Sequence, residues 1–156
     1  MEIVLFRPEI PPNTGNIGRL CVNAGASLGI IGEPSFDLSE KSARRAGLDY
    51  WQHLDLKRYK DWDEFLLQKK DRRIFLISKY GKSVYASVRF EEDDILVFGR
   101  ETSGLPEEIM SSEKVEACLN IPMPNESRSI NLSNAVAIVL FESLRQIYSW
   151  SENPLP

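Results

Sequence analysis

The stretch that decides the fold is Ile95-Leu96-Val97-Phe98, followed at once by Gly99-Arg100-Glu101-Thr102-Ser103-Gly104-Leu105-Pro106. A short continuous apolar run is typical of a strand buried on both faces, and a polar segment rich in Gly and Pro ends it. Pro106 then suits the first position of a short helix, which we expect over 106–111. Strand, loop and helix in this order predict an α/β unit, in which ligands bind beyond the carboxyl ends of the strands.

The same arrangement occurs at two other places in the chain. Ile3–Phe6 predicts a buried strand, and the Pro-rich segment 8–19 follows it. Cys118–Ile121 predicts the last strand, and the polar segment 121–134 follows that one. Because the carboxyl ends of parallel strands meet at one edge of a sheet, the three loops predict a single composite site.

The rest of the pattern predicts an α/β fold with a mostly parallel sheet flanked by helices. Leu28–Ile31 and Ile74–Ile77 are further expected strands. Helices are expected from Asn13 or Thr14 to about Gly25, over 39–46, from Asp61 to Lys70, and from Leu132 to about Tyr148. In the last of these, Ala135–Phe141 is apolar all round and must be covered by the core or by a partner subunit. We expect one domain over residues 1–150 and a frayed tail over 151–156.

Composition narrows the class of protein. A length of 156 residues fits one domain, and the net charge of −4 argues against binding nucleic acid by bulk electrostatics, although a local basic patch remains compatible with it. Cys21 and Cys118 lack metal-ligand spacing and His53 is the one histidine, so we expect no metal and a reduced, cytoplasmic compartment. We also expect no signal peptide and no membrane span.

The loops exclude several common chemistries. The segment 99–104 has the glycine spacing of a Walker A loop, but Leu105 and Pro106 stand where that motif requires lysine and a hydroxyl residue. The segment 13–18 lacks the glycine pattern of a dinucleotide site, and one histidine argues against a hydrolase triad. Main-chain groups, small side chains and apolar strand ends suit a flat heterocycle such as adenosine, but they do not name the reaction.

Two loop features have both a structural and a functional interpretation. Arg19 is expected near the first turn of its helix, where a cation opposes the helix dipole at a cost of up to about 1 kcal/mol. It is therefore either an exposed arginine or a functional one. The third loop holds a surplus of hydroxyl and amide side chains, of which at least one must cap the following helix: Ser127, Ser129, Asn131, Ser133 and Asn134.

The three loops, together with the segment 44–50, resemble the motifs of the bacterial tRNA (cytidine/uridine-2'-O)-methyltransferases that act on the wobble nucleotide, which are SPOUT-class enzymes. The resemblance covers essentially residues 1–148. It implies transfer of a methyl group from S-adenosyl-L-methionine to the ribose of C or U at position 34 in tRNA, in leucine isoacceptors. It also implies a C-terminal deep trefoil knot, a homodimer, and recognition of the anticodon stem-loop.

The resemblance also assigns roles to individual positions. The cofactor-binding positions are Ile77, Gly99, Gly104, Leu105, Ile121, Met123, Ser129 and Leu132. The catalytic positions are Asn13, Arg19, Glu101, Ser129 and Asn131. Arg19 is expected to bind a backbone phosphate and the 2'-hydroxyl, with phosphate or water relaying the proton, or to act as the base itself. Glu101 is expected to orient Arg19 or Arg100, or to cap the helix at Pro106.

RNA binding is expected to use basic and aromatic side chains. The phosphate-contact candidates are Arg7, Arg44, Arg45, Arg100 and Arg128. Tyr50 and Trp51 either stack on anticodon bases or pack in the interior. Three other functions remain open: methylation of another tRNA position or of ribosomal RNA, a non-catalytic RNA-binding module with the same knot, and a nucleotide-binding oxidoreductase without the glycine fingerprint.

Overall fold

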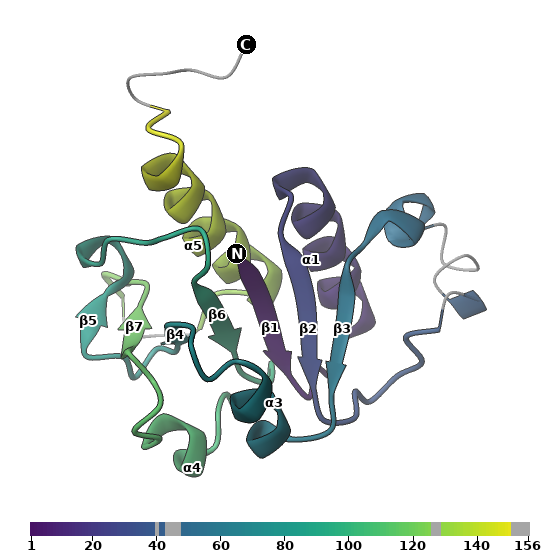
Figure 1. Ribbon diagram of the computed structural model, residues 1–156, viewed down its shortest axis with the longest axis horizontal. Coiled ribbons are helices and arrows are strands. Elements are labelled where there is room, and N and C mark those ends of the chain that lie inside the picture. Colours follow the sequence, from purple (N-terminus) through teal and green to yellow (C-terminus); the bar gives the residue numbers. More distant parts are fainter. Residues whose placement is uncertain (40, 43–47, 126–128, 151–156) are drawn as a thin grey trace.

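The computed structural model describes residues 1–39, 41–42, 48–125 and 129–150. In this part of the chain, seven strands form one sheet in the order β3-β2-β1-β6-β4-β7-β5, and every neighbouring pair is parallel (Figure 1). The strands are β1 (Glu2–Phe6), β2 (Ser27–Ile31), β3 (Leu56–Tyr59), β4 (Ile74–Ile77), β5 (Ser83–Val84), β6 (Ile95–Phe98) and β7 (Ala117–Asn120). The expected mostly parallel sheet is confirmed.

Helices cover both faces of the sheet (Figure 1). The described helices are α1 (Pro11–Ala24), α3 (Trp62–Gln68), α4 (Glu107–Met110) and α5 (Leu132–Ile147), with 3-10 turns at η1 (Asp49–His53) and η2 (Tyr85–Ser87). Side chains of α1 and α5 share one hydrophobic cluster with the sheet, and those of α3 and α4 share the other. None of these helices is long and apolar enough to cross a membrane.

The strands are apolar throughout because both of their faces are buried. In β1, Ile3 and Leu5 join the cluster under α1 and α5, whereas Val4 and Phe6 join the cluster under α3 and α4. Successive side chains of a strand point to opposite faces, so a strand between two helical layers needs an apolar residue at every position. The same pattern in β4 and β6 confirms the two buried strands predicted there.

Helix α1 begins earlier than predicted. Its N-cap is Ile10, and Pro11 and Pro12 occupy the first helical positions, where a missing N–H costs nothing. Asn13 and Thr14 therefore lie inside the helix and do not cap it. The predicted end is confirmed, because Gly25 adopts the left-handed conformation at φ 65° and its N–H bonds the carbonyls of the last turn.

The other boundaries agree to within one or two residues. Asp61 caps α3 by accepting the Glu64 N–H at 2.9 Å, as predicted, but the helix ends at Gln68. Pro106 is the N-cap of α4 rather than its first residue, and β7 begins at Ala117. The helix expected over 39–46 lies mostly outside the described residues, as does the tail 151–156.

A strand of the fold differs from the sequence prediction. Strand β3 was not expected, because Leu56-Lys57-Arg58-Tyr59 carries two charges and buries only Tyr59 fully; it pairs with β2 at the edge of the sheet. The core covers only part of helix α5, since Ile138 and Phe141 are 36% and 43% exposed. An outward apolar strip therefore remains on this chain, and its cover by a partner subunit stays a prediction.

Candidate active site at the carboxyl edge of the sheet

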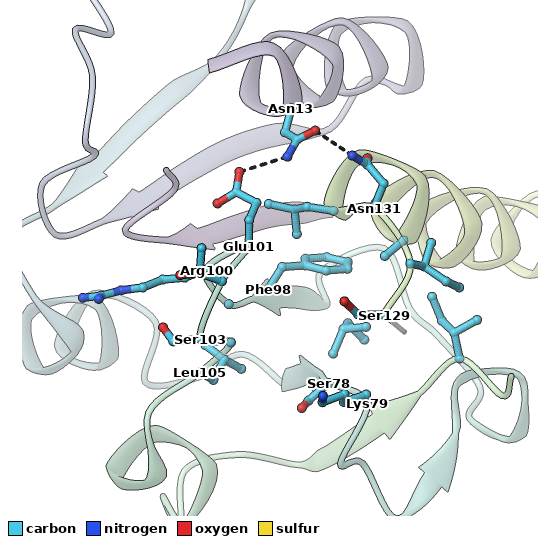
Figure 2. A pocket seen from close by; sticks show the side chains of 18 of the residues that line it. Asn13, Ser78, Lys79, Phe98, Arg100, Glu101, Ser103, Leu105, Ser129 and Asn131 are labelled. Atoms are coloured by element: carbon cyan, nitrogen blue, oxygen red, sulfur yellow. Dashed lines mark hydrogen bonds between the residues drawn. The ribbon is translucent and has the colours of Figure 1, made fainter. Parts of the chain in front are cut away.

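A cavity of about 400 Å³ lies beyond the carboxyl ends of β4, β6 and β7, against the first turns of α1 and α5 (Figure 2). The three loops predicted to form one site do line it together. All eight predicted cofactor positions are among the lining residues: Ile77, Gly99, Gly104, Leu105, Ile121, Met123, Ser129 and Leu132. Four of the five predicted catalytic residues also line it: Asn13, Glu101, Ser129 and Asn131.

A chain of hydrogen bonds joins the three loops along one side of the cavity (Figure 2). The Asn131 Nδ2 donates to Asn13 Oδ1 at 3.0 Å, and Asn13 Nδ2 donates to Glu101 Oε1 at 3.1 Å. The Asn131 Oδ1 in turn caps α5 by accepting from the Ser133 N–H at 2.9 Å. Both polar ends of the Asn13 amide are thus engaged within the protein.

The first two loops are also fastened directly to each other. The Glu101 carboxylate accepts the main-chain N–H groups of Glu9 and Ile10 at 2.9 and 3.1 Å. In the other direction, the Glu9 carboxylate accepts from the N–H and hydroxyl of Thr102 at 3.2 and 2.7 Å. The hydrogen bond from Thr102 lowers the pKa of Glu9, which keeps this carboxylate ionised.

This arrangement corrects two expectations. Glu101 contacts neither Arg19 nor Arg100 and does not cap α4; it holds the loop before α1. Glu9 was also missed in the sequence analysis. Its carboxylate lies within the Pro-rich segment 8–19, and Glu101 lies in the second loop, so a pair of acidic residues in two loops was the available signal. Asn131 has both of its possible roles, since it caps α5 and lies at the cavity.

The glycines of the second loop are required by the path of the loop itself. A Cβ on Gly99 would lie 2.3 Å from the Gly104 carbonyl carbon and 2.4 Å from the Leu105 nitrogen. Gly104 has φ 71°, and its N–H and carbonyl pair with Arg100. Gly99 therefore permits the loop to close on itself beside the cavity, because no other residue fits this approach.

The cavity walls suit a flat heterocycle. Ile77 and Ile121 provide apolar surface from the ends of β4 and β7, and Leu105 provides it from the loop after β6. Ser129 adds a hydroxyl that makes no hydrogen bond within the described residues, and the cavity volume falls in the range of small-molecule sites. Main-chain groups at the strand ends supply edges for hydrogen bonding. The residues present thus fit an adenosine-type ligand.

Arg19 does not line the cavity. It is the ninth residue of α1 rather than part of its first turn, so the predicted conflict with the helix dipole does not arise. Its exposed side chain lies over the Tyr50 ring, with the guanidinium carbon 5.0 Å from the ring centre, and the Tyr50 hydroxyl donates to the Gly15 carbonyl at 2.5 Å. Burial raises the pKa of Tyr50 while the nearby Arg19 opposes that rise.

The neighbouring aromatic and sulfur residues are structural. Trp51 is 9% exposed and packs in the main core, so it does not present a stacking surface in this chain. His53 lies exposed at the end of η1. Cys21 is fully buried, and burial raises the pKa of its thiol to about 12, as expected of an inert core cysteine.

The basic candidates for RNA binding separate into two groups. Arg44, Arg45 and Arg128 lie outside the described residues. Arg7 and Arg100 both lie beside the Phe6 ring, with guanidinium carbons 5.4 and 5.6 Å from its centre. Figure 2 shows the Arg100 side chain leading away from the cavity. Across residues 1–39, 41–42, 48–125 and 129–150, no group of three or more His, Cys, Asp or Glu residues is arranged to hold a metal ion.

Two comparisons with known proteins, added to the fold and this cavity, define the class of enzyme. The chain belongs to the SpoU rRNA Methylase family, whose family model matches residues 1–141. A relative from Aeromonas hydrophila, named tRNA (cytidine(34)-2'-O)-methyltransferase, is 45% identical over 147 residues and is covered over 94% of both chains. These matches confirm the family that the three loop motifs suggested.

Solved structures agree with that assignment. One, described as giving structural insights into the 2-OH methylation of C/U34 on tRNA, matches with a TM-score of 0.87 and 40% identity, over 95% of this chain and 96% of that one. Another, an AdoMet-bound rRNA methyltransferase from Sinorhizobium meliloti, has a TM-score of 0.80 and 25% identity, over 92% of this chain and 55% of the other.

Proposed function

We propose that this protein transfers a methyl group from S-adenosyl-L-methionine to the 2'-hydroxyl of C or U at the wobble position of tRNA, with leucine isoacceptors as substrates. The observation that carries the proposal is the single cavity that all three motif loops line. The wobble nucleotide is supported as the substrate by two similar proteins, since the 45% identical relative and the 40% identical structure are both described as acting on position 34 of tRNA. A cytoplasmic location and a site without metal remain predictions.

The cavity residues define how the cofactor would be held. Main-chain groups at Ile77, Gly99 and Ile121 would bind the adenosine edges, and Leu105 and Leu132 would supply apolar walls, since all five residues line the cavity. When bound, the cofactor supplies an electrophilic methyl group on a sulfonium. The protein must align the hydroxyl with that methyl group and assist the loss of its proton.

The chain Asn131–Asn13–Glu101 is assigned a positioning role. Its hydrogen bonds fix the start of α1, the start of α5 and the second loop relative to one another. Because both ends of the Asn13 amide are occupied, Asn13 acts by holding this geometry. The Ser129 hydroxyl also lines the cavity and, among the described residues, has no hydrogen bond, so it is the catalytic candidate left open to a ligand.

Arg19 is assigned to the phosphate and 2'-hydroxyl of the RNA. A guanidinium keeps its charge and can donate two parallel hydrogen bonds, so it would stabilise developing alkoxide charge while phosphate or water accepts the proton. Arg19 is exposed and does not line the cavity of its own protomer. We therefore infer that it acts at the cavity of a second copy in a homodimer.

Two further observations support the dimer and the knot. Ile138 and Phe141 on α5 are exposed, and an apolar strip of this kind is typical of a surface that a partner covers. The loop after β4 lies tightly on β7, since a Cβ on Gly81 would be 2.3 Å from the Leu119 carbonyl carbon, and Asn120 Nδ2 donates to the Gly81 carbonyl at 2.7 Å. That tight crossing is what a chain threaded through a loop requires.

The direct test combines the purified protein, S-adenosyl-L-methionine and unmodified leucine tRNA, followed by mass spectrometry of digested nucleosides and mapped fragments. A 2'-O-methyl group at the first anticodon position is expected. A mark at another tRNA position or on ribosomal RNA would refute the substrate, and the absence of any mark on total RNA would favour the non-catalytic binding module.

Mixing variants tests the shared site. Arg19→Ala and Glu101→Ala protomers are each expected to be nearly inactive. After subunit exchange, half of the dimers are mixed and each has one complete site, so the mixture should recover about a quarter of the normal rate. No recovery, with exchange verified by mass, would show that Arg19 serves its own cavity.

A further inference from the structure

A second hollow lies on the other side of the loop that follows β6. It measures about 680 Å³ and is bounded by the ends of β1 and β2, the start of α3 and the region around α4. Arg100, Ser103 and Gly104 line both hollows, so the second loop is a wall between them. The methyl-transfer chemistry proposed above makes no use of this second hollow.

One side of the hollow presents unpaired cationic groups. Arg7 and Arg100 line it beside the Phe6 ring, and neither has a carboxylate within 4 Å among the residues described. The Arg100 Nε is buried and has no hydrogen-bond partner in the same part of the chain. That buried donor is a cost to the fold, and the guanidinium groups of Arg7 and Arg100, which line the hollow without a carboxylate, leave their charge for an anionic ligand.

The backbone under Arg7 is adapted to this position. Arg7 has φ 43°, a left-handed conformation that is rare for a residue with a side chain. Gly32, at φ 73°, lies beside it, and a Cβ there would be 2.8 Å from both Cγ and Nε of Arg7. Such strain is kept where the surroundings fix the backbone, and it clusters at ligand sites.

The other side of the hollow is acidic and aromatic. Asp61, Trp62 and Asp63 line it from the start of α3, and Glu108 lines it from α4. Trp62 stacks on Phe65 with ring centres 5.1 Å apart, which fixes the indole plane. The carboxylates do not pair with the arginines, so the hollow suits a ligand with an anionic end, a flat ring and hydrogen-bond donors.

We propose that this second hollow binds a nucleotide of the RNA that adjoins the methylated one, with its phosphate on Arg7 and Arg100 and an amino-bearing base toward Trp62 and Asp63. The proposal rests on the proposed function, because it places this nucleotide just across the second loop from the reacting ribose. Bases of single-stranded loops stack on aromatic side chains, and carboxylates accept from the amino group of cytosine. Uracil lacks that amino group and is expected to bind less well.

The first experiment measures nucleotide binding by nuclear magnetic resonance. The protein is saturated with S-adenosylhomocysteine to occupy the first cavity, and cytidine or uridine 5'-monophosphate is then titrated. We expect the cytidine nucleotide to shift the Trp62 indole N–H, assigned with Trp62→Phe, and the uridine nucleotide to bind several-fold more weakly. Equal shifts with inorganic phosphate, or no preference for cytidine, would overturn the proposal.

Variants then locate the two ends of the ligand. Arg7→Ala should weaken both nucleotides about tenfold, the loss of one charge-assisted hydrogen-bonded contact. Asp63→Asn should remove the preference for cytidine while leaving the folded spectrum intact. The matched control is Arg89→Ala, since Arg89 is exposed and only its carbonyl is used, by Arg73 at 3.1 Å.

The second experiment uses a labelled anticodon stem-loop to separate RNA from a free nucleotide as the source of the ligand. Arg7→Ala is expected to raise the Kd for the stem-loop about tenfold, with unchanged affinity for S-adenosylhomocysteine and no effect of Arg89→Ala. Unchanged stem-loop affinity would assign the hollow to free nucleotides and overturn the proposal. Since this readout is affinity, a failure of methyl transfer would refute the proposed function separately.

Discussion

The two edges of the sheet use charged residues in opposite ways. At the amino edge, Glu2 is 1% exposed and accepts from the Tyr59 hydroxyl at 2.6 Å and from Lys69 Nζ at 2.7 Å. There too, Arg73 makes two hydrogen bonds to the buried Asp94 carboxylate, at 2.8 and 2.7 Å. Each buried carboxylate at this edge has its cation or donor in place.

At the carboxyl edge, Arg7 and Arg100 lack such partners, and so does Arg19 on α1. Arg7, Arg19 and Arg100 lie over aromatic rings and have no carboxylate within 4 Å in the described part of the chain. A guanidinium on an aromatic face keeps its N–H donors available for an anion. The comparison teaches that the buried charges at the amino edge are paired within the fold, whereas the unpaired arginines are those for which we propose contacts to RNA.

The largest expected effect is on ligand binding at the carboxyl edge. Gly99→Val places side-chain atoms where the Gly104 and Leu105 backbone now lies, so the second loop must move. We expect affinity for S-adenosylhomocysteine, measured by calorimetry, to fall at least about 100-fold. The control is Gly25→Ala at φ 65°, which should lower stability by about 1 kcal/mol and leave affinity unchanged. Normal affinity in Gly99→Val would remove this loop from the cofactor site.

The opposite result is expected at the amino edge. Glu2→Ala leaves Lys69, whose side chain is 12% exposed, without its carboxylate. The free energy of unfolding in urea should fall by about 3 kcal/mol, with unchanged affinity for S-adenosylhomocysteine. Replacing both partners, as Glu2→Met with Lys69→Met, should restore much of that loss. Lys60→Ala is the control, because the exposed 3.8 Å pair with Asp61 contributes under about 1 kcal/mol.

A smaller effect tests whether Glu101 belongs with the fold or with the site. Glu101→Gln keeps the size of the side chain but weakens three hydrogen bonds to the first loop. We expect kcat/KM for methyl transfer to fall about tenfold and the free energy of unfolding to change by less than about 1 kcal/mol. Glu113→Gln, at an exposed position without an ion pair, should do neither. A large loss of stability with normal turnover would show that Glu101 supports the fold rather than the site.

The smallest expected effect is the reactivity of Cys21, a buried thiol on α1. With its pKa raised to about 12, Cys21 holds roughly one part in ten thousand as thiolate at pH 8. A higher pH increases that fraction, but only about tenfold per unit. A thiol reagent should therefore label the half-buried Cys118 first and Cys21 only as the protein unfolds. Rapid labelling of Cys21 at pH 8 would mean that α1 opens locally.

Periodicity and loop composition were enough to predict most of the fold. The runs in β4 and β6 could be assigned because full burial on two faces requires apolar residues at each position. Loop composition predicted that the three loops share one site, and the family resemblance then named Ile77, Gly99 and Ile121, which do line the cavity. Gly25 ended α1 as predicted, since its conformation favours glycine.

Features that depend on distant contacts could not be predicted. Glu101 accepts hydrogen bonds from Glu9 and Ile10, which lie 92 and 91 positions earlier in the sequence. Nothing in the sequence near Glu101 indicates those partners. Strand β3 has a polar sequence because it lies at the sheet edge, which only the assembled sheet defines. Arg19 was misplaced along its helix because Pro11 and Pro12, rather than a polar cap, begin α1.

The strand order has a consequence for how the chain is made. β1 pairs on one side with β2, which follows it closely, but on the other side with β6, at Glu2↔Ile95. During synthesis the first half of the sheet can therefore assemble while one edge of β1 stays open until β6 emerges. An open apolar strand edge invites pairing with other chains. We expect the newly made protein to be most prone to aggregation during that interval, well before its site exists.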